Sequence, residues 1–201
     1  MRGDGDGWVF GGDGSRRWGR YGAAGLLLRA PGPSGHATVL LQHRAGWSHH
    51  GGTWALPGGA IDSHESPTGA AVREAGEEAG IAGDSLTVRG ERVTWTKDSG
   101  WSYTTVVADA AAQLDTVPNG ESTELRWVAE DDVESLPLHP SFAQSWPALR
   151  SVPVRAVLGP DVDSTPPRTV DLGERGFGWI VAVVARSEEH TSELQSRPHL
   201  V

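Results

Sequence analysis

The 201-residue chain contains no cysteine, which excludes disulfide bridges and thiolate metal sites. It also lacks any apolar run near the roughly 18 residues needed to span a membrane. The apolar stretch Trp179–Ala185 is far too short for that. The N-terminus is rich in glycine and aspartate and has no hydrophobic segment of a signal peptide. We therefore expect a cytoplasmic protein without a membrane partner.

Basic residues are scarce relative to acids. There are 17 lysines and arginines against 26 aspartates and glutamates, which gives a formal net charge of −9. Such a balance argues against nonspecific binding to nucleic acid. An acidic protein can still bind small phosphate compounds where metal ions lie between the two. The length suffices for one sizeable core without a second domain, and the sequence carries no signal for an oligomeric state.

A predicted helix in the middle of the chain gathers acids on one face. Its start is marked by Ser66, a suitable N-cap, and by Pro67 at the first helical position. Gly80 marks its end. A divalent cation would relieve the repulsion between clustered acids, and Mg²⁺ often bridges a protein carboxylate to a substrate phosphate. The acids stand at i, i+3 and i+4 and so share a face: Glu74, Glu77 and Glu78.

Two apolar or small-residue features flank this acidic face. A stripe of small alanines, at Ala71, Ala75 and Ala79, would let the helix approach a sheet closely. The preceding residues, 56–60 (LPGGA), indicate the end of a strand running into a glycine loop. Backbone carbonyls exposed by such a loop can also bind a metal. The segment therefore predicts a metal-dependent chemistry on phosphates.

The 23 residues from Gly59 to Ile81 resemble the Nudix box, G-x5-E-x7-R-E-U-x-E-E-x-G-U, where U is apolar. An ordinary salt-bridged surface helix after a glycine-rich turn is the alternative, but it does not account for so many fixed residues. The resemblance implies an α/β fold, the Nudix α/β/α sandwich with a mixed β-sheet. Every fixed position matches: Gly59, Glu65, Arg73, Glu74, Glu77, Glu78 and Gly80, with Ala75 and Ile81 at the apolar places.

The resemblance also implies hydrolysis of a nucleoside diphosphate linked to another group. Mg²⁺, with Mn²⁺ as a substitute, would be held by the Gly59 carbonyl and the three helix glutamates and would activate a water. Glu74 or Glu121 would then take the proton of that water. We expect Glu74, Glu121 and Arg73 to be the catalytic residues. Arg73 and Glu65 would orient the helix and the loop.

Two expectations concern residues outside the box. Arg44 lies thirteen residues before Pro57, a spacing similar to that of a phosphate-contacting arginine in the MutT-like branch. A solvated arginine at a strand end is the alternative. Glu121, six residues before Trp127, is similar to the family's loop glutamate that reaches back to the metal. Glu124 competes for this role, and a solvated loop acid is the alternative.

Signatures of particular Nudix substrates are missing. The proline of many ADP-ribose pyrophosphatases would fall near Thr96, and the tyrosine of many dinucleoside polyphosphate hydrolases near Asp98, from which Tyr103 is displaced. The NADH hydrolase pattern is also absent. These absences favour a MutT-like nucleoside triphosphate pyrophosphatase, including one that acts on oxidised nucleotides. The alternatives are an ADP-ribose or nucleotide-sugar pyrophosphatase and, in another class, a non-catalytic nucleotide sensor, although sensors usually lose box glutamates.

Histidines and tryptophans supply further candidates. The histidines His36, His43, His49 and His50 show no fixed zinc spacing, so we expect solvated loop residues. A contact from His49 or His50 to a base or phosphate is the alternative. Most tryptophans serve packing, but four of the nine here are placed where they could stack a nucleobase: Trp47, Trp54, Trp95 and Trp101.

The chain divides into four expected parts. Residues 1–17 form a glycine-rich N-terminal segment with a short edge strand at 8–10, and residues 18–150 form the Nudix domain. Residues 151–185 are a C-terminal extension of uncertain structure with a strand near 178–184. Residues 186–196 (RSEEHTSELQS) resemble a translated sequencing adapter, so we expect 186–201 to be an artefact tail that packs against nothing. Within the domain we expect strands at 22–29, 38–43, 85–95, 101–108 and 125–129, and helices at 67–79, 130–136 and 141–149.

Overall fold

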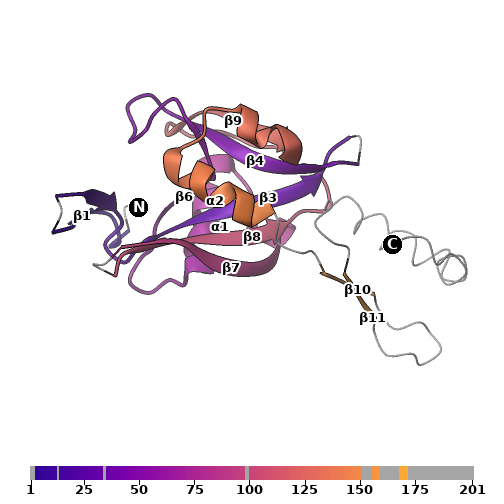
Figure 1. Ribbon diagram of the computed structural model, residues 1–201, viewed down its shortest axis with the longest axis horizontal. Helices are drawn as coiled ribbons and strands as arrows, with labels where there is room; N and C mark the ends of the chain where they lie inside the picture. Colours follow the sequence, from indigo (N-terminus) through magenta and orange to yellow (C-terminus); the bar gives the residue numbers. More distant parts are fainter. Residues whose placement is uncertain are drawn as a thin grey trace, which may run out of the picture.

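The structure is a computed structural model and describes residues 3–12, 14–33, 35–97, 100–150, 155–158 and 168–171. A mixed seven-stranded sheet lies at its centre (Figure 1). The order β5-β4-β3-β8-β7 forms the main path, while β6 pairs with β3 and β9 pairs with β4. The strands are β3 (Ala23–Pro31), β4 (Ala37–Arg44), β5 (Trp54–Ala55), β6 (Gly58–Ala60), β7 (Thr87–Thr96), β8 (Ser102–Asp109) and β9 (Ser122–Ala129).

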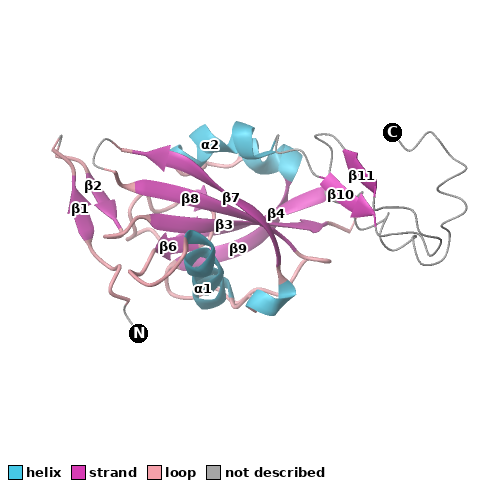
Figure 2. Ribbon diagram, turned by 90° about the horizontal axis from the view of Figure 1, so that it is seen from below, coloured by secondary structure: helices cyan, strands magenta, loops and turns pink. Residues whose placement is uncertain are grey.

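Helices cover both faces of the sheet, as Figure 2 shows for α1 (Pro67–Ala79) and α2 (Pro140–Arg150). Because side chains alternate along a strand, β3 serves both faces. Leu26 and Leu28 pack in the core beneath α1, and Leu27 packs in the core beneath α2. The expected α/β/α sandwich is therefore confirmed. Two 3₁₀ helices complete the framework: η1 (Gly83–Ser85) and η2 (Glu130–Ser135).

The ends of α1 are those that the sequence predicts. The Ser66 hydroxyl accepts a hydrogen bond from the Gly69 amide at 3.1 Å, and Pro67 opens the helix. Gly80 adopts a left-handed φ of 71°, which glycine tolerates without strain. The alanine face lies against β3, with Ala71, Ala75 and Ala79 fully buried. This close packing holds the next face of the helix at the edge of β6.

The residues before the box differ from the expected glycine loop. Gly58–Ala60 form the strand β6, whose register pairs Ala24 with Gly59 and Gly25 with Gly58. Backbone approaches so closely there that a Cβ at Gly58 would lie 2.3 Å from the Ala24 carbonyl oxygen. The glycines therefore allow a third strand pairing on β3 and do not mark an open loop. Residues 130–136, expected to be helical, contain the 3₁₀ helix η2.

A small hairpin stands at the N-terminus, beyond the ends of β7 and β8 in Figure 1. β1 (Trp8–Phe10) pairs antiparallel with β2 (Arg16–Trp18), so the expected strand at 8–10 belongs to a separate two-stranded sheet. The indole of Trp101 donates to the Gly19 carbonyl at 2.8 Å, and Lys97 donates to the Ser15 hydroxyl at 2.8 Å. These bonds fasten the hairpin to the β7–β8 connection.

The chain beyond α2 is described only in part. β10 (Arg155–Leu158) and β11 (Arg168–Asp171) pair antiparallel in a sheet of their own. The strand expected near 178–184 and the expected artefact tail at 186–201 lie outside the described residues. Within the described part of the chain, no helix is both long and apolar enough to cross a membrane.

Candidate active site

The carboxylates of α1 meet the backbone of β6. Glu78 is almost completely buried, and its Oε2 accepts a hydrogen bond from the Gly58 amide at 2.7 Å. Glu74 lies against Gly59, where an added Cβ would approach its Oε1 to 2.4 Å. Only glycine at position 59 leaves room for this carboxylate. Glu77 is the outermost of the three, with 57% of its side chain exposed.

Burial and mutual repulsion disfavour the charged forms of these acids. Burial raises the pKa of Glu78 to about 8, and the neighbouring charges of Glu74 and Glu121 add to the effect. Burial also raises the pKa of Glu74 to about 6, with contributions from Glu77 and Glu121. Among the described residues no lysine or arginine forms an ion pair with Glu78. The cluster thus offers carboxylate oxygens that a divalent cation would neutralise.

Arg73 joins the helix to the segment that precedes it. Its guanidinium forms a bidentate pair with Glu65, at 2.8 and 3.0 Å, and donates to the Ala60 carbonyl at 2.9 Å. The same group contacts Glu74 at 2.9 Å and Glu77 at 3.5 Å. This pairing lowers the pKa of Glu65. With its donors engaged in this way, Arg73 fixes the position of the Glu74 carboxylate.

Glu121 reaches the cluster from a loop that is attached to the end of α1. The Asn119 amide donates to the Glu78 carbonyl at 3.3 Å, and the Glu121 carbonyl accepts from the Ala45 amide at 2.9 Å. The charge of Glu121 acts on the pKa of both Glu74 and Glu78. Glu124, the competing candidate, is paired with Arg126 at 2.6 Å. The loop of Glu121 is therefore attached to α1 and the charge of Glu121 acts on the helix carboxylates, whereas Glu124 is paired with Arg126.

A pocket of about 350 Å³ adjoins the cluster. Gly58 and Gly59 line it, and these two glycines contact the carboxylates of Glu78 and Glu74. Arg44 also lines it, and its Nε donates to the His49 carbonyl at 3.1 Å. A guanidinium suited to phosphate thus lines the same pocket as the glycines that lie against the acidic cluster.

A model of the NUDIX domain matches residues 20–149. The chain belongs to the Nudix hydrolase family. A Mycobacterium tuberculosis protein named "Putative 8-oxo-dGTP diphosphatase 3" is 57% identical over 185 residues, which cover 89% of this chain and 85% of the relative. The crystal structure of a Nudix hydrolase from M. smegmatis, RenU, has a TM-score of 0.70 at 65% identity, over 73% of this chain and 93% of that chain.

More distant structures share the fold alone. The C. elegans Ap4A hydrolase in a binary complex is 22% identical, with a TM-score of 0.53, over 63% of this chain and 94% of that chain. The family and its named relatives make this chain an enzyme that hydrolyses the diphosphate linkage of nucleoside diphosphate derivatives. Nudix hydrolases work with a divalent metal, and the carboxylates around β6 are chemically suited to one.

The pocket of this Nudix hydrolase contains residues that the sequence did not single out for it. Tyr103, from β8, lines the pocket, and its hydroxyl would collide with a Cβ at Gly25. Burial and the charges of Glu78 and Glu74 raise the pKa of Tyr103, whereas Arg44 lowers it. The acidic cluster and Arg44 therefore act in opposite directions on the pKa of Tyr103. The sequence did not predict Tyr103 as a pocket residue, because it is displaced from the family tyrosine position near Asp98.

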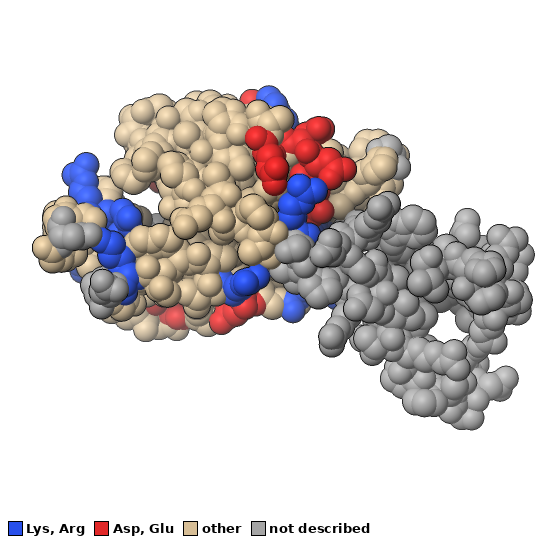
Figure 3. Space-filling model, in the orientation of Figure 1, with Lys and Arg blue, Asp and Glu red and all other residues tan. Residues whose placement is uncertain are grey.

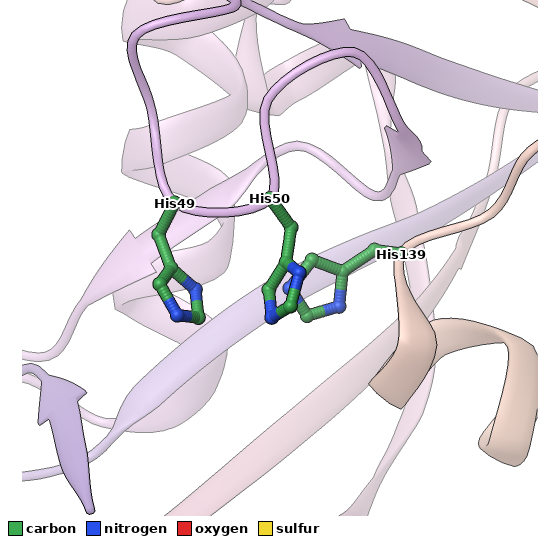
Figure 4. A group of neighbouring side chains, drawn as sticks. All are labelled: His49, His50 and His139. Atoms are coloured by element: carbon green, nitrogen blue, oxygen red, sulfur yellow. The ribbon is translucent and has the colours of Figure 1, made fainter.

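Three histidines gather at the pocket wall, two from the loop after β4 and one at the start of α2 (Figure 4). The three are His49, His50 and His139. One ring nitrogen from each lies within 4.8 Å of those of the other two. Burial, followed by the charge of Arg44, lowers the pKa of His139 to about 4. Burial and the charge of His50 also lower the pKa of His49. His139 was invisible to sequence reasoning because it lies about ninety residues from the other two.

The remaining tryptophan and histidine candidates lie in different parts of the structure. Trp95 and Trp101 line the pocket with ring centroids 5.6 Å apart, whereas Trp54 belongs to the core. Trp47 is 74% exposed. The ring nitrogens of His43 contact the Thr123 hydroxyl at 2.5 Å and the Gly52 carbonyl at 3.1 Å, so His43 holds β4 to its neighbours.

Proposed function

We propose that this Nudix hydrolase is a magnesium-dependent pyrophosphatase of nucleoside triphosphates, with oxidised deoxyguanosine triphosphate as the preferred substrate. The proposal is supported by the contact of Glu74 and Glu78 with two glycines that line a pocket of about 350 Å³, by the charge of Glu121 that acts on both carboxylates, and by the lack of a cationic partner for Glu78 among the described residues. The mycobacterial relative named for 8-oxo-dGTP supports the choice of substrate. The absence of other subfamily signatures supports it as well.

The box residues would hold the metal in the manner that the resemblance implies. Mg²⁺ would be held by Glu74, Glu77 and Glu78 together with the Gly59 carbonyl, and Mn²⁺ would serve as a substitute. When bound, the ion neutralises the diphosphate and lowers the pKa of a water. Arg44, which lines the same pocket, would donate to a phosphate oxygen.

The other side chains of the site would act as the base or hold the site in position. Glu121, on an exposed loop near both helix carboxylates, is our choice as the base that removes the proton from water. Glu74 is held by Arg73 and is the alternative base. Arg73 and Glu65 act as positioning residues, because their bidentate pair and the bond to the Ala60 carbonyl lock α1 onto β6.

A nucleotide panel tests this function directly. The full chain would be incubated with 8-oxo-dGTP, dGTP, ADP-ribose and a nucleotide sugar, with MgCl₂ or with EDTA. Products would be separated by ion-exchange chromatography. We expect 8-oxo-dGTP to yield the nucleoside monophosphate and pyrophosphate with the highest kcat/KM, only when magnesium is present.

Other outcomes have distinct meanings. Faster hydrolysis of ADP-ribose than of either triphosphate would refute the substrate assignment. Tight nucleotide binding without hydrolysis of any compound would favour a sensor. A cytoplasmic location, where such nucleotides are found, forms part of the same proposal.

A further inference from the structure

The hairpin β1–β2 builds one wall of the pocket, although it precedes the matched family domain, which starts at residue 20. Trp8 and Trp18 pack edge to face with ring centroids 5.3 Å apart. The guanidinium of Arg16 stacks over Trp8 at 4.9 Å, and that of Arg17 stacks over Trp95 of β7 at 4.7 Å. Figure 3 shows basic side chains gathered at this end of the molecule. The hairpin thus adds two arginines to the pocket that the family domain does not supply.

These arginines keep hydrogen-bonding capacity for a ligand. A guanidinium that stacks on an aromatic face still directs its N–H groups outward in its own plane. Arg17 uses one donor on the Arg16 carbonyl at 3.1 Å. In the described part of the chain, neither Arg16, Arg17 nor Arg44 forms an ion pair with a carboxylate.

The histidines belong to the same basic region. The charges of Arg44, Arg17 and Arg16 all act on His49, and those of Arg44 and Arg17 act on His139. By contrast, the charges that act on Glu74 are those of Arg73, Glu77 and Glu121, and those that act on Glu78 are Glu74 and Glu121. The pocket therefore lies next to the acidic cluster at Gly58 and Gly59 and has a basic end at the hairpin.

The basic end is suited to an anion and not to a metal ion. Nearby guanidinium charges repel a cation. The Nδ1 atom of His139 also accepts a hydrogen bond from the Ser141 amide at 3.3 Å, as a cap of α2. The neutral ring then carries its hydrogen on Nε2, which makes that atom a donor and removes the lone pair that a metal needs.

We propose that the hairpin completes a second phosphate site, in which Arg16, Arg17 and the histidines bind phosphate groups beyond the linkage held at the carboxylates. The basic-end residues are Arg16, Arg17, His49, His50 and His139. The proposal rests on the function proposed above and refines its substrate class. In this arrangement the phosphate chain of a nucleoside triphosphate would run from the carboxylates to the basic end. A nucleotide sugar has no further phosphate to offer, so the basic end selects triphosphates.

Binding of inorganic tripolyphosphate, measured by calorimetry in EDTA and low salt, tests this site without turnover. We expect the wild-type chain to bind it, and Arg16→Gln/Arg17→Gln to bind it about tenfold or more weakly, because two charge-assisted contacts are lost. Arg17→Lys, which keeps the charge but not the planar fork, should lie between them. Arg92→Gln is the matched control: Arg92 is an exposed arginine outside the pocket whose guanidinium donates to the Ala148 carbonyl.

Kinetics supply a second readout. In magnesium, the double variant should lose about tenfold in kcat/KM for the triphosphate, whereas Arg92→Gln should keep the wild-type kcat/KM. Unchanged affinity for tripolyphosphate in the double variant would overturn the second site. Absence of hydrolysis by the wild type would refute the proposed function but leave the calorimetric result standing.

Two other ligands of the basic end, a nucleobase and a zinc ion, would give different binding results. Loss of guanosine binding in the double variant, with tripolyphosphate binding retained, would show that the arginines stack a base and would overturn the proposal. Stoichiometric Zn²⁺ binding that disappears in His49→Ala/His50→Ala would show that the imidazoles are metal ligands, which would also overturn it.

Discussion

Replacement of Glu78 by glutamine should stabilise the metal-free protein while it removes activity. In the folded chain the pKa of Glu78 is raised to about 8 from an ordinary value of 4.5. The folded state therefore binds a proton more tightly than the unfolded state does, and stability falls as pH rises from about 4.5 to 8. Each pKa unit is worth about 1.4 kcal/mol, so the carboxylate costs about 3 kcal/mol at pH 7. Glutamine has no charge to lose and keeps an acceptor for the Gly58 amide.

Urea unfolding in EDTA at pH 5, 7 and 8.5 measures this effect. At pH 7 we expect Glu78→Gln to be more stable than the wild type by about 3 kcal/mol, or roughly 6–12 °C in Tm. At pH 5 the difference should fall to about 1 kcal/mol or less. Glu124→Gln, which alters an exposed ion-paired acid, should change stability by less than about 0.5 kcal/mol at any of these pH values. An equal or lower stability of Glu78→Gln at pH 7 would refute the reasoning.

Three further changes probe neighbouring parts of the site. Glu121→Gln should lower kcat by about 10²-fold or more if Glu121 is the base. The control Glu124→Gln should change kcat less than twofold. Equal effects of the two substitutions on kcat in a magnesium assay would contradict the assignment. Gly59→Ala places a methyl group 2.4 Å from Glu74 Oε1 and should reduce kcat/KM at least about tenfold with an unchanged circular dichroism spectrum. Arg73→Lys should lower both kcat and the urea midpoint of unfolding, because an ammonium cannot replace the bidentate pair with Glu65 and the bond to the Ala60 carbonyl. An unfolding midpoint equal to that of the wild type would show that this network does not hold α1.

The sequence predicted the parts of the fold that depend on local chemistry. Ser66, Pro67 and Gly80 act within one or two turns of α1, so its ends were readable. The apolar run that forms β3 is likewise a local signal, and its side chains are buried on both faces of the sheet. Strand pairing is not local, which is why β6 was mistaken for a loop. Its pairing with β3 depends on how closely two glycine-containing backbones approach each other.

In the candidate site, too, the sequence predicted the local features and not those that depend on tertiary packing. The helix offset predicted that the carboxylates share a face, but not that Glu78 would be buried while Glu77 stays largely exposed. That difference follows from the position of β6 beside the helix. His139 and the hairpin arginines join the pocket only through tertiary packing, so no spacing in the sequence could reveal them.

The central claim is that the buried carboxylates of α1 hold a divalent cation. Electron paramagnetic resonance of Mn²⁺ tests it most directly, because bound and free ions give distinct signals. At pH 8 we expect the wild-type chain to bind Mn²⁺ stoichiometrically, and Glu74→Gln/Glu78→Gln to bind it at least about tenfold more weakly, with Glu124→Gln as the unchanged control. Equal Mn²⁺ affinity in the wild type and the double variant would contradict the account.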